Sequence, residues 1–190
     1  MSYECIKVTK QNHVTSVLLN RPDALNAITP EMHHELQDAF DVFSKDENEF
    51  VAVIRGAGDR AFCAGSDLKT IAAGGFKAYP KSGYAGLIER FDLNKPLIAA
   101  VDGFALGGGF EVALACDIIV ATHRSSFGLP EPLVGAVALG GGIHRLARQI
   151  GLKQAMGMVL TADRVSANEG FRMGFVNQVV DTDALDKTVD

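Results

Sequence analysis

The stretch "KPLIAAVDGFALGGGFEVALACDIIVA", residues 95–121, decides the fold that we expect. It contains an apolar run at 97–103, three consecutive glycines at 107–109, a short apolar segment and a second apolar run that begins at 116. Continuous apolar runs with β-branched residues are typical of strands that are buried on both faces. The segment between them has the character of a short buried helix. The pattern therefore predicts strand, helix and strand in succession, as in an α/β protein.

The helix in this stretch opens on glycines and has one acid, Glu111, near its start. Glycine lets a backbone approach a ligand closely, and a helix N-terminus presents unpaired N–H groups with a partial positive charge. Together these features could hold an oxygen on which negative charge develops. The glycines could equally serve only to let the helix pack tightly, with Glu111 in water. This segment alone leaves both interpretations open.

Helices and strands alternate through the rest of the chain. A helix of about 14 residues is predicted to begin at Thr29-Pro30-Glu31, where a capping hydroxyl precedes proline and an acid. A final helix is expected to begin close to the last residue, with Asp183 as its cap. Further strands are expected at 13–20, 50–56, 116–122 and 175–180, and further helices at 143–151 and 153–162.

Length and composition indicate one soluble globular domain. The 190 residues, 47% hydrophobic and 22% charged, suit a single core, residues 1–190, which we expect to lack a C-terminal part. A net charge of −5 without basic runs argues against a nucleic-acid partner. No apolar run approaches the roughly 20 residues of a membrane span, and no secretion signal is evident. Three isolated cysteines favour a reducing compartment, so we expect a cytoplasmic protein without a membrane partner.

A second segment with free backbone groups is "AFCAGSDL", residues 61–68. The small residues Ala64, Gly65 and Ser66 precede Asp67, which can cap a helix that begins at Leu68. Backbone N–H groups are again left free at a helix start. Taken alone, this motif is better explained as an ordinary capped turn.

A third segment, "SFGLPEPLVG" at 126–135, places Glu131 between Pro130 and Pro132. The prolines rigidify the backbone around that one acid. A lone acid in a proline loop is usually solvated. Glu111 and Glu131 together, beside two sites with free N–H groups, form a better constellation. One acid can take a proton while the other supplies one, and each positioned group is worth about 10² to 10⁴ in rate.

Other chemistries find little support in the sequence. The five histidines show no metal-ligand spacing, and the adjacent His33 and His34 are expected at the surface. Cys63 has no histidine placed to activate it, so a small buried residue is the simpler interpretation. The glycine triplets match neither a P-loop nor a dinucleotide fingerprint. No metal site and no nucleotide cofactor are predicted.

With these segments in view, the chain resembles the enoyl-CoA hydratase/isomerase (crotonase) superfamily along essentially its whole length. The segments that carry the resemblance are "LNRPDALNAIT", "AFCAGSDLK", the stretch at 95–121 and "FGLPEPLVG", all in family order. The fold implied is α/β, a crotonase (ClpP-like) spiral of repeated β-β-α units followed by a C-terminal helical region. The implied assembly is a homotrimer, or a hexamer built as a dimer of trimers.

The resemblance also implies roles for the residues of the motifs. The backbone N–H groups of Ser66 and Gly108 match the oxyanion hole that binds the thioester oxygen of an acyl-CoA. Glu111 and Glu131 match the acids with which hydratases add water across the double bond of a 2-enoyl-CoA. The expected cofactor is none beyond coenzyme A as part of the substrate. Substrate contacts are expected near a set of small and apolar positions and one acid: Ala24, Leu25, Ala64, Asp67 and Leu68.

Two departures keep alternatives open. Leu139, in "ALGGG" at 138–142, stands where many family hydratases have glycine, near the position of the attacking water. The segment 74–96 is closer to carnitinyl-CoA dehydratases, a branch that also keeps both acids. The alternatives to an enoyl-CoA hydratase are therefore a carnitinyl-CoA dehydratase, a Δ3-Δ2 enoyl-CoA isomerase, which needs one acid, and a non-catalytic acyl-CoA-binding homologue.

Overall fold

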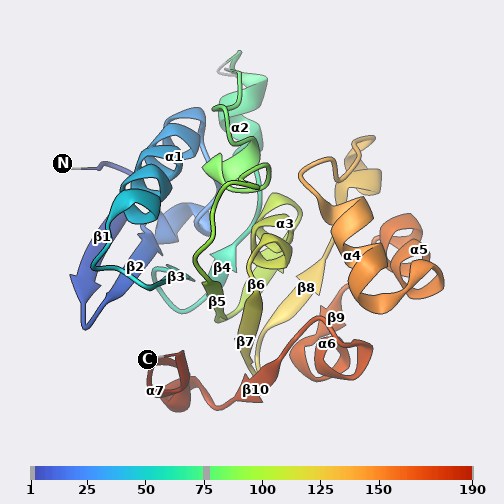
Figure 1. Ribbon diagram of the computed structural model, residues 1–190. Coiled ribbons are helices and arrows are strands. Elements are labelled where there is room, and N and C mark those ends of the chain that lie inside the picture. The colour runs from blue at the N-terminus through green and yellow to red at the C-terminus, as the bar shows by residue number, and fades with distance from the viewer. Residues whose placement is uncertain (1–2, 75–77, 190) are drawn as a thin grey trace.

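The computed structural model describes residues 3–74 and 78–189 and consists of two packed sheets with helices around them (Figure 1). Within these residues, a six-stranded sheet has the order β1-β2-β3-β5-β7-β10 and a four-stranded sheet the order β4-β6-β8-β9. The strands are β1 (Ile6–Gln11), β2 (Val14–Leu19), β3 (Val51–Gly56), β4 (Ala61–Cys63), β5 (Leu97–Val101), β6 (Phe104–Leu106), β7 (Ile118–Thr122), β8 (Ser126–Gly128), β9 (Val165–Ser166) and β10 (Gln178–Val180).

The helices and short 3-10 turns connect these strands. The α-helices are α1 (Pro30–Lys45), α2 (Leu68–Ala72), α3 (Gly108–Ala115), α4 (Gly142–Ile150), α5 (Leu152–Thr161), α6 (Ala167–Met173) and α7 (Leu185–Val189). The 3-10 turns are η1 (Pro22–Ala24), η2 (Tyr84–Gly86), η3 (Glu131–Val134) and η4 (Thr182–Ala184).

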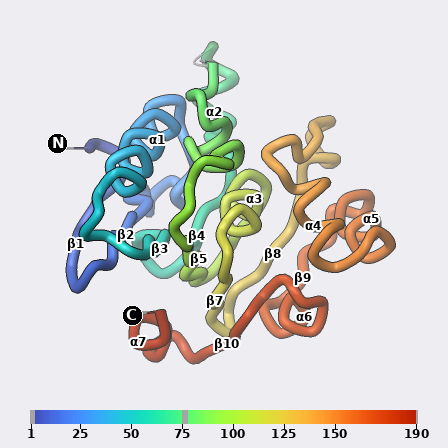
Figure 2. The backbone as a smooth tube through the Cα atoms, viewed as in Figure 1, coloured from blue at the N-terminus to red at the C-terminus, as the bar shows by residue number. Residues whose placement is uncertain are grey.

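The chain winds as a spiral of β-β-α units, whose path can be followed in Figure 2. In the successive units β3-β4-α2 and β5-β6-α3, the first strand joins the six-stranded sheet and the second joins the four-stranded sheet. β7 and β8 repeat the same step, and the equivalent strands of neighbouring units pair in parallel. The α/β class and the spiral expected from the sequence are confirmed. Because the units repeat, the loops after β4, β6 and β8 come together at one end of the smaller sheet.

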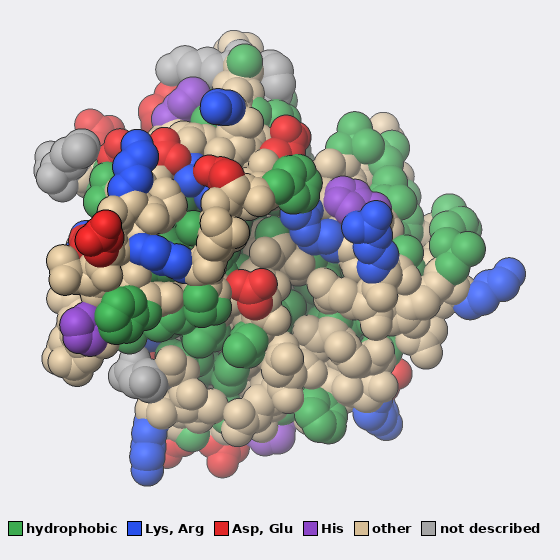
Figure 3. All heavy atoms as spheres, in the orientation of Figure 1, with side chains coloured by type: hydrophobic (Ala, Val, Ile, Leu, Met, Phe, Trp, Pro, Cys, Tyr) green, Lys and Arg blue, Asp and Glu red, His purple; other side chains and the backbone are tan. Residues whose placement is uncertain are grey.

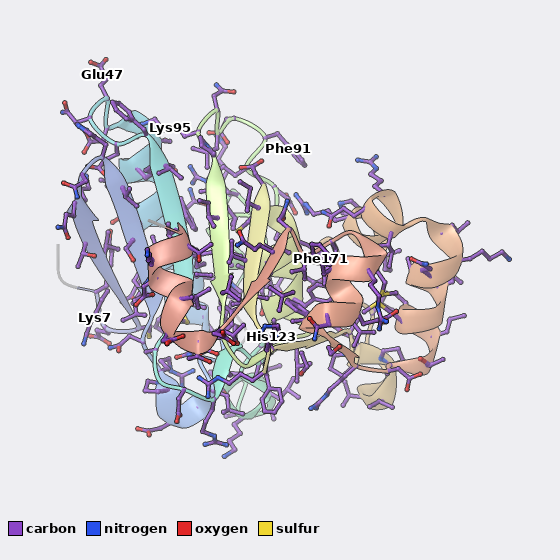
Figure 4. All side chains as sticks on the ribbon, turned by 90° about the horizontal axis from the view of Figure 1, so that it is seen from below. Lys7, Glu47, Phe91, Lys95, His123 and Phe171 are labelled. Carbon is purple, nitrogen blue, oxygen red and sulfur yellow. The ribbon has the colours of Figure 1, made fainter. Side chains whose placement is uncertain are left out.

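The central strands of the six-stranded sheet, β3, β5 and β7, are covered on both faces, which explains their apolar runs. Ala52 and Ile54 belong to the main core, whereas Val53 packs on the opposite face with Leu185 and Val189 of α7. Seen from below, α7 crosses the strands of this sheet (Figure 4). A strand with side chains buried on both sides has no polar alternation. The apolar runs therefore reflect two-sided burial.

Most elements expected from the sequence are present. Strands occupy the predicted positions, and α1 begins at Pro30 after Thr29, whose hydroxyl oxygen accepts from the Met32 N–H at 3.2 Å. β1 was not predicted from the sequence, and neither were the three-residue strands of the smaller sheet, which are too short to show a periodicity. Asp183 does not cap the last helix. It lies inside η4, and α7 begins at Leu185.

A cluster of three phenylalanine rings lies in the main core, and its loss should destabilise the fold. Phe127 is fully buried, with ring centroids 5.2 Å from both Phe110 and Phe175. Phe127→Ala should lower the free energy of unfolding by about 3–5 kcal/mol, because it leaves a cavity as well as losing transfer energy. Urea unfolding would measure the change.

The matched control is Phe91→Ala, since Phe91 is 83% exposed and projects from the surface in Figure 4. That substitution should change the free energy by no more than about 0.5 kcal/mol. Equal midpoints and slopes for the two variants would show that the phenylalanine cluster does not support the fold.

Candidate functional site

The loop after β4 and the start of α3 lie directly against each other. β4 and β6 pair in parallel, with Cys63 beside Ala105, so the two chain segments leave the smaller sheet together. A Cβ atom built on Gly65 would stand 3.1 Å from the backbone nitrogen of Gly108. The structure thus brings together two segments that the sequence analysis had to treat separately, including the predicted oxyanion positions Ser66 and Gly108.

Both of these residues direct a backbone N–H away from the fold's own hydrogen-bond ladders. Ser66 forms a parallel bridge with Ile28 in which the flanking groups make the bonds, from Ile28 N–H to Gly65 O at 2.8 Å and from Asp67 N–H to Ile28 O at 3.0 Å. The N–H of Ser66 itself therefore points to the opposite side of the chain. Gly108 is the first residue of α3, where an N–H has no intrahelical acceptor.

Glu111 is buried at the first turn of α3, with 4% of its surface exposed. Its Oε1 accepts a hydrogen bond from the backbone N–H of Gly142, at the first residue of α4, at 2.9 Å. A Cβ atom on Gly140 would overlap the other carboxylate oxygen, so a side chain there would displace the Glu111 carboxylate. Two of the glycines at 140–142 therefore form a cradle around Glu111, which excludes the solvated position that the sequence had left open.

Burial raises the pKa of Glu111 to about 7, because desolvation disfavours the charged carboxylate. The N–H groups of Gly142 and Gly140 and the charge of Arg145 oppose this rise, whereas repulsion from Glu131 adds to it. A carboxyl group with a pKa near neutrality is populated in both protonation states at physiological pH. This is the property that a general acid or base requires.

Glu131 faces the same region from η3, whose first residue it is. A Cβ atom on Gly107 would stand 3.1 Å from its Oε1, so the carboxyl group reaches the start of α3. Its Oε2 is buried and has no hydrogen-bond partner within the described part of the chain. Burial raises the pKa of this carboxyl group as well. The two acids thus meet across the glycines that precede α3, and one oxygen of Glu131 is available to a ligand.

Three further side chains at the site were not found from the sequence. The Oη of Tyr84 lies 3.1 Å from the Oγ of Ser66. Arg145 donates to the carbonyl of Ile88 at 2.6 Å and lies within electrostatic range of Glu111, as does Tyr79. Tyr79 and Tyr84 come from an aperiodic segment and Arg145 from an amphipathic helix. Only the tertiary structure places them at the site.

The expectation that His33 lies at the surface is wrong. The residue is 6% exposed, and its Nδ1 accepts the backbone N–H of Ala85 at 2.8 Å. Burial lowers the pKa of His33 to about 4, so the ring is neutral and can accept this bond. Adjacent histidines on a helix do face different directions, and here one direction leads into the core.

Positions expected to contact the substrate gather beside the same loop. The N–H of Ala64 donates to the carbonyl of Leu25 at 3.0 Å, which holds η1 and Ala24 next to the loop after β4. The carboxylate of Asp67 pairs with Arg21 at 2.9 Å and caps α2, and Leu68 is exposed. These contacts bring the predicted positions together on one side of Ser66. Their role toward a ligand stays a prediction.

Leu139 lies differently from the glycines that follow it. Leu139 is 80% exposed, whereas Gly140 and Gly142 lie against the carboxyl group of Glu111. Figure 3 shows hydrophobic side chains gathered at this corner of the molecule, over η3 and the helices after it. A contact of Leu139 with substrate or attacking water stays a prediction.

Several simpler expectations can be compared directly with the structure. Cys63 is buried, and burial raises the pKa of its thiol to about 12, as suits an unreactive core residue. Among the described residues, no cluster of histidines, cysteines and acids has the geometry of a metal site. In the same part of the chain, no helix has both the length and the apolar character needed to span a membrane.

Comparison with known proteins gives consistent results. A family model described as enoyl-CoA hydratase/isomerase matches residues 9–189. The carnitinyl-CoA dehydratase of Proteus mirabilis (strain HI4320) is 42% identical over 184 residues, 96% of this chain and 70% of that protein. A solved carnitinyl-CoA hydratase from Mycobacterium avium has a TM-score of 0.93 at 38% identity, over 99% of this chain and 73% of the other. A solved enoyl-CoA hydratase from Mycobacterium tuberculosis H37Rv has a TM-score of 0.91 at 38% identity, over 97% and 72%.

The raised pKa of Glu111 makes a prediction about stability. In the unfolded chain the carboxyl group has its ordinary pKa, near 4.5, whereas in the fold it titrates near 7. The folded protein therefore loses stability as the pH rises through this window, by up to about 3 kcal/mol. Glu111→Gln cannot ionise, so relative to the unsubstituted protein it should gain that amount between pH 4 and pH 8.

Urea unfolding at several pH values would measure this difference. Glu47→Gln provides the control, because Glu47 is an exposed acid that projects from the surface in Figure 4. A Glu111→Gln curve that runs parallel to the control across the whole pH range would contradict the buried, neutral-pH carboxyl group.

Proposed function

We propose, since this chain belongs to the enoyl-CoA hydratase/isomerase family as its motifs indicated, that it is a hydro-lyase acting on acyl-CoA thioesters. The reaction is the reversible addition of water to the double bond of a 2-enoyl-CoA. The observation that carries the proposal is a pair of acids at one site, the buried Glu111 with a pKa near 7 and the half-buried Glu131 with one unpartnered carboxylate oxygen. They lie beside two backbone N–H groups that the fold leaves unused.

The first part of the mechanism is recognition of the thioester carbonyl. The N–H groups of Ser66 and Gly108 donate to its oxygen and draw electrons away from the double bond. As attack proceeds, this oxygen becomes an enolate, and the two donors bind it more strongly than they bind the ground state. Because the donors are fixed by the chain before substrate arrives, each is worth about 3 kcal/mol in the barrier.

The second part is the movement of two protons. Ionised Glu111 takes a proton from water while the water oxygen forms a bond to C3, and the π electrons shift to give the enolate. Protonated Glu131 then gives its proton to C2, and the carbonyl re-forms. One water has been added, Glu111 carries the proton and Glu131 is ionised. Exchange with solvent restores the starting state.

The acyl group that we favour second is one with a quaternary ammonium. The relative from Proteus mirabilis is named a carnitinyl-CoA dehydratase, and the similar solved protein from Mycobacterium avium is named a carnitinyl-CoA hydratase. Dehydration of carnitinyl-CoA is the reverse of the addition above, with crotonobetainyl-CoA as the unsaturated partner. The same two acids and the same oxyanion hole serve this reaction, so the choice between acyl groups leaves the mechanism unchanged.

The remaining features of the proposal follow from the family. Coenzyme A enters as part of the substrate, near Ala24, Leu25, Ala64, Asp67 and Leu68, and no other cofactor takes part. The enzyme works in the cytoplasm as a homotrimer or a dimer of trimers. These assignments rest on the resemblance.

Loss of enoyl absorbance with crotonyl-CoA and with crotonobetainyl-CoA would test the function. The unsubstituted chain should hydrate at least one of them, and Glu111→Gln and Glu131→Gln should each lower kcat by about 10² to 10⁴. Glu47→Gln, which removes an exposed carboxylate, should leave the rate unchanged.

Each other outcome points to a different protein. Turnover that survives one of the two site substitutions, together with movement of a double bond between C3 and C2, would identify an isomerase. Tight acyl-CoA binding without turnover of either substrate would leave a non-catalytic homologue.

A further inference from the structure

Tyr84 lies against both predicted oxyanion donors. Its Oη is 3.1 Å from the Oγ of Ser66, and a Cβ atom on Gly108 would overlap that same Oη. The phenol therefore contacts both the first residue of α3 and the loop after β4. We infer that the Tyr84 hydroxyl is a third hydrogen-bond donor to the thioester oxygen, a catalytic residue in addition to the two backbone N–H groups. This inference rests on the proposed function and adds a residue to it.

The position of Tyr84 is fixed by α1. The backbone on either side of it is bound to this helix, because the Ala85 N–H donates to His33 Nδ1 at 2.8 Å and the Ser82 N–H donates to Gln37 Oε1 at 2.9 Å. The rings of His33 and Tyr84 also meet edge to face, with centroids 4.6 Å apart. A donor held in this way needs no reorganisation when charge develops on the substrate.

The chemistry of the hydroxyl suits a donor. Tyr84 is 4% exposed, and burial raises the pKa of its phenol well above 10, with the charge of Glu111 acting in the same direction. The group therefore keeps its proton over the whole physiological range. A phenol can accept one hydrogen bond and donate another. The Ser66 hydroxyl can serve as the donor to Oη, which leaves the phenolic proton for a second acceptor such as the thioester oxygen.

A third donor would act mainly on the transition state. A carbonyl oxygen has two lone pairs, which the N–H groups of Ser66 and Gly108 satisfy in the ground state. The enolate oxygen has a full charge and a further lone pair, so an extra donor gains strength only as the reaction proceeds. Interactions of this kind raise kcat and leave ground-state binding unchanged.

Tyr84→Phe tests the inference, because it removes one oxygen and keeps the buried ring. With crotonyl-CoA or crotonobetainyl-CoA, kcat should fall by about 10²-fold and KM should change little. The enolate absorbance of bound acetoacetyl-CoA, an analogue of the charged intermediate, should fall at constant pH. Affinity for butyryl-CoA, which has no double bond and cannot react, should be unchanged.

Tyr3→Phe is the matched control. The Tyr3 hydroxyl donates to Asp38 of α1 at 2.7 Å, so the same chemical change is made at a phenol with a different partner. This variant should keep kcat and the acetoacetyl-CoA spectrum. Thermal melting of both variants separates loss of fold from loss of the donor.

The result that overturns the inference is a Tyr84→Phe protein with unchanged kcat and an unchanged acetoacetyl-CoA spectrum. Parallel losses of butyryl-CoA affinity and melting temperature would also overturn it, because they indicate a purely structural ring. If the unsubstituted chain binds acetoacetyl-CoA as an enolate but hydrates no substrate, the proposed hydratase function fails. In that case the acetoacetyl-CoA spectra of the unsubstituted protein and of Tyr84→Phe still test the role of Tyr84. If the unsubstituted protein forms no enolate with acetoacetyl-CoA, the inference about Tyr84 is overturned.

Discussion

The burial of one carboxyl group constrains the rest of this structure. Glu111 lies on a helix whose other residues are apolar, and its oxygens are held by backbone N–H groups at the start of α4. Leaving such a group without partners would cost several kcal/mol, so the glycine loop before α4 must close over it. The closure brings η3, and with it Glu131, to the start of α3. The position of α4 and the burial of the Glu111 carboxyl group therefore depend on each other.

The spiral supplies the second element of the site, which is free backbone donors. Each β-β-α unit leaves the smaller sheet at the same end, so the loop after β4 and the start of α3 are neighbours in space. Ser66 and Gly108 lie close together because the two units repeat. The oxyanion-binding site that we propose depends on the backbone and on the absence of a side chain at Gly108. The side chain at residue 66 is therefore not what defines the donor.

The aromatic segment between α2 and β5 adds what the spiral does not provide. The hydroxyl of Tyr84 contacts Ser66, and the neutral ring of His33 on α1 accepts a hydrogen bond from the backbone N–H of Ala85. Through this bond the core residue His33 helps to position Tyr84 at the site. The proposed hydratase thus combines one repeated feature, the pair of N–H groups, with one feature particular to this segment, a buried phenol.

The sequence by itself determined the α/β class, the main strands, α1 with its Thr29 cap and the segments that hold Glu111, Glu131, Ser66 and Gly108, because apolar runs, caps and glycines are local signals. It missed β4, β6 and β8, which are only three residues long and exist through pairing with their neighbours. It also misplaced His33, whose burial depends on the segment that packs over α1. Only the tertiary structure decided that Glu111 is buried with a pKa near 7 and that Tyr84 reaches Ser66. Desolvation and distance between residues far apart in the chain are properties of packing, and no local pattern encodes them.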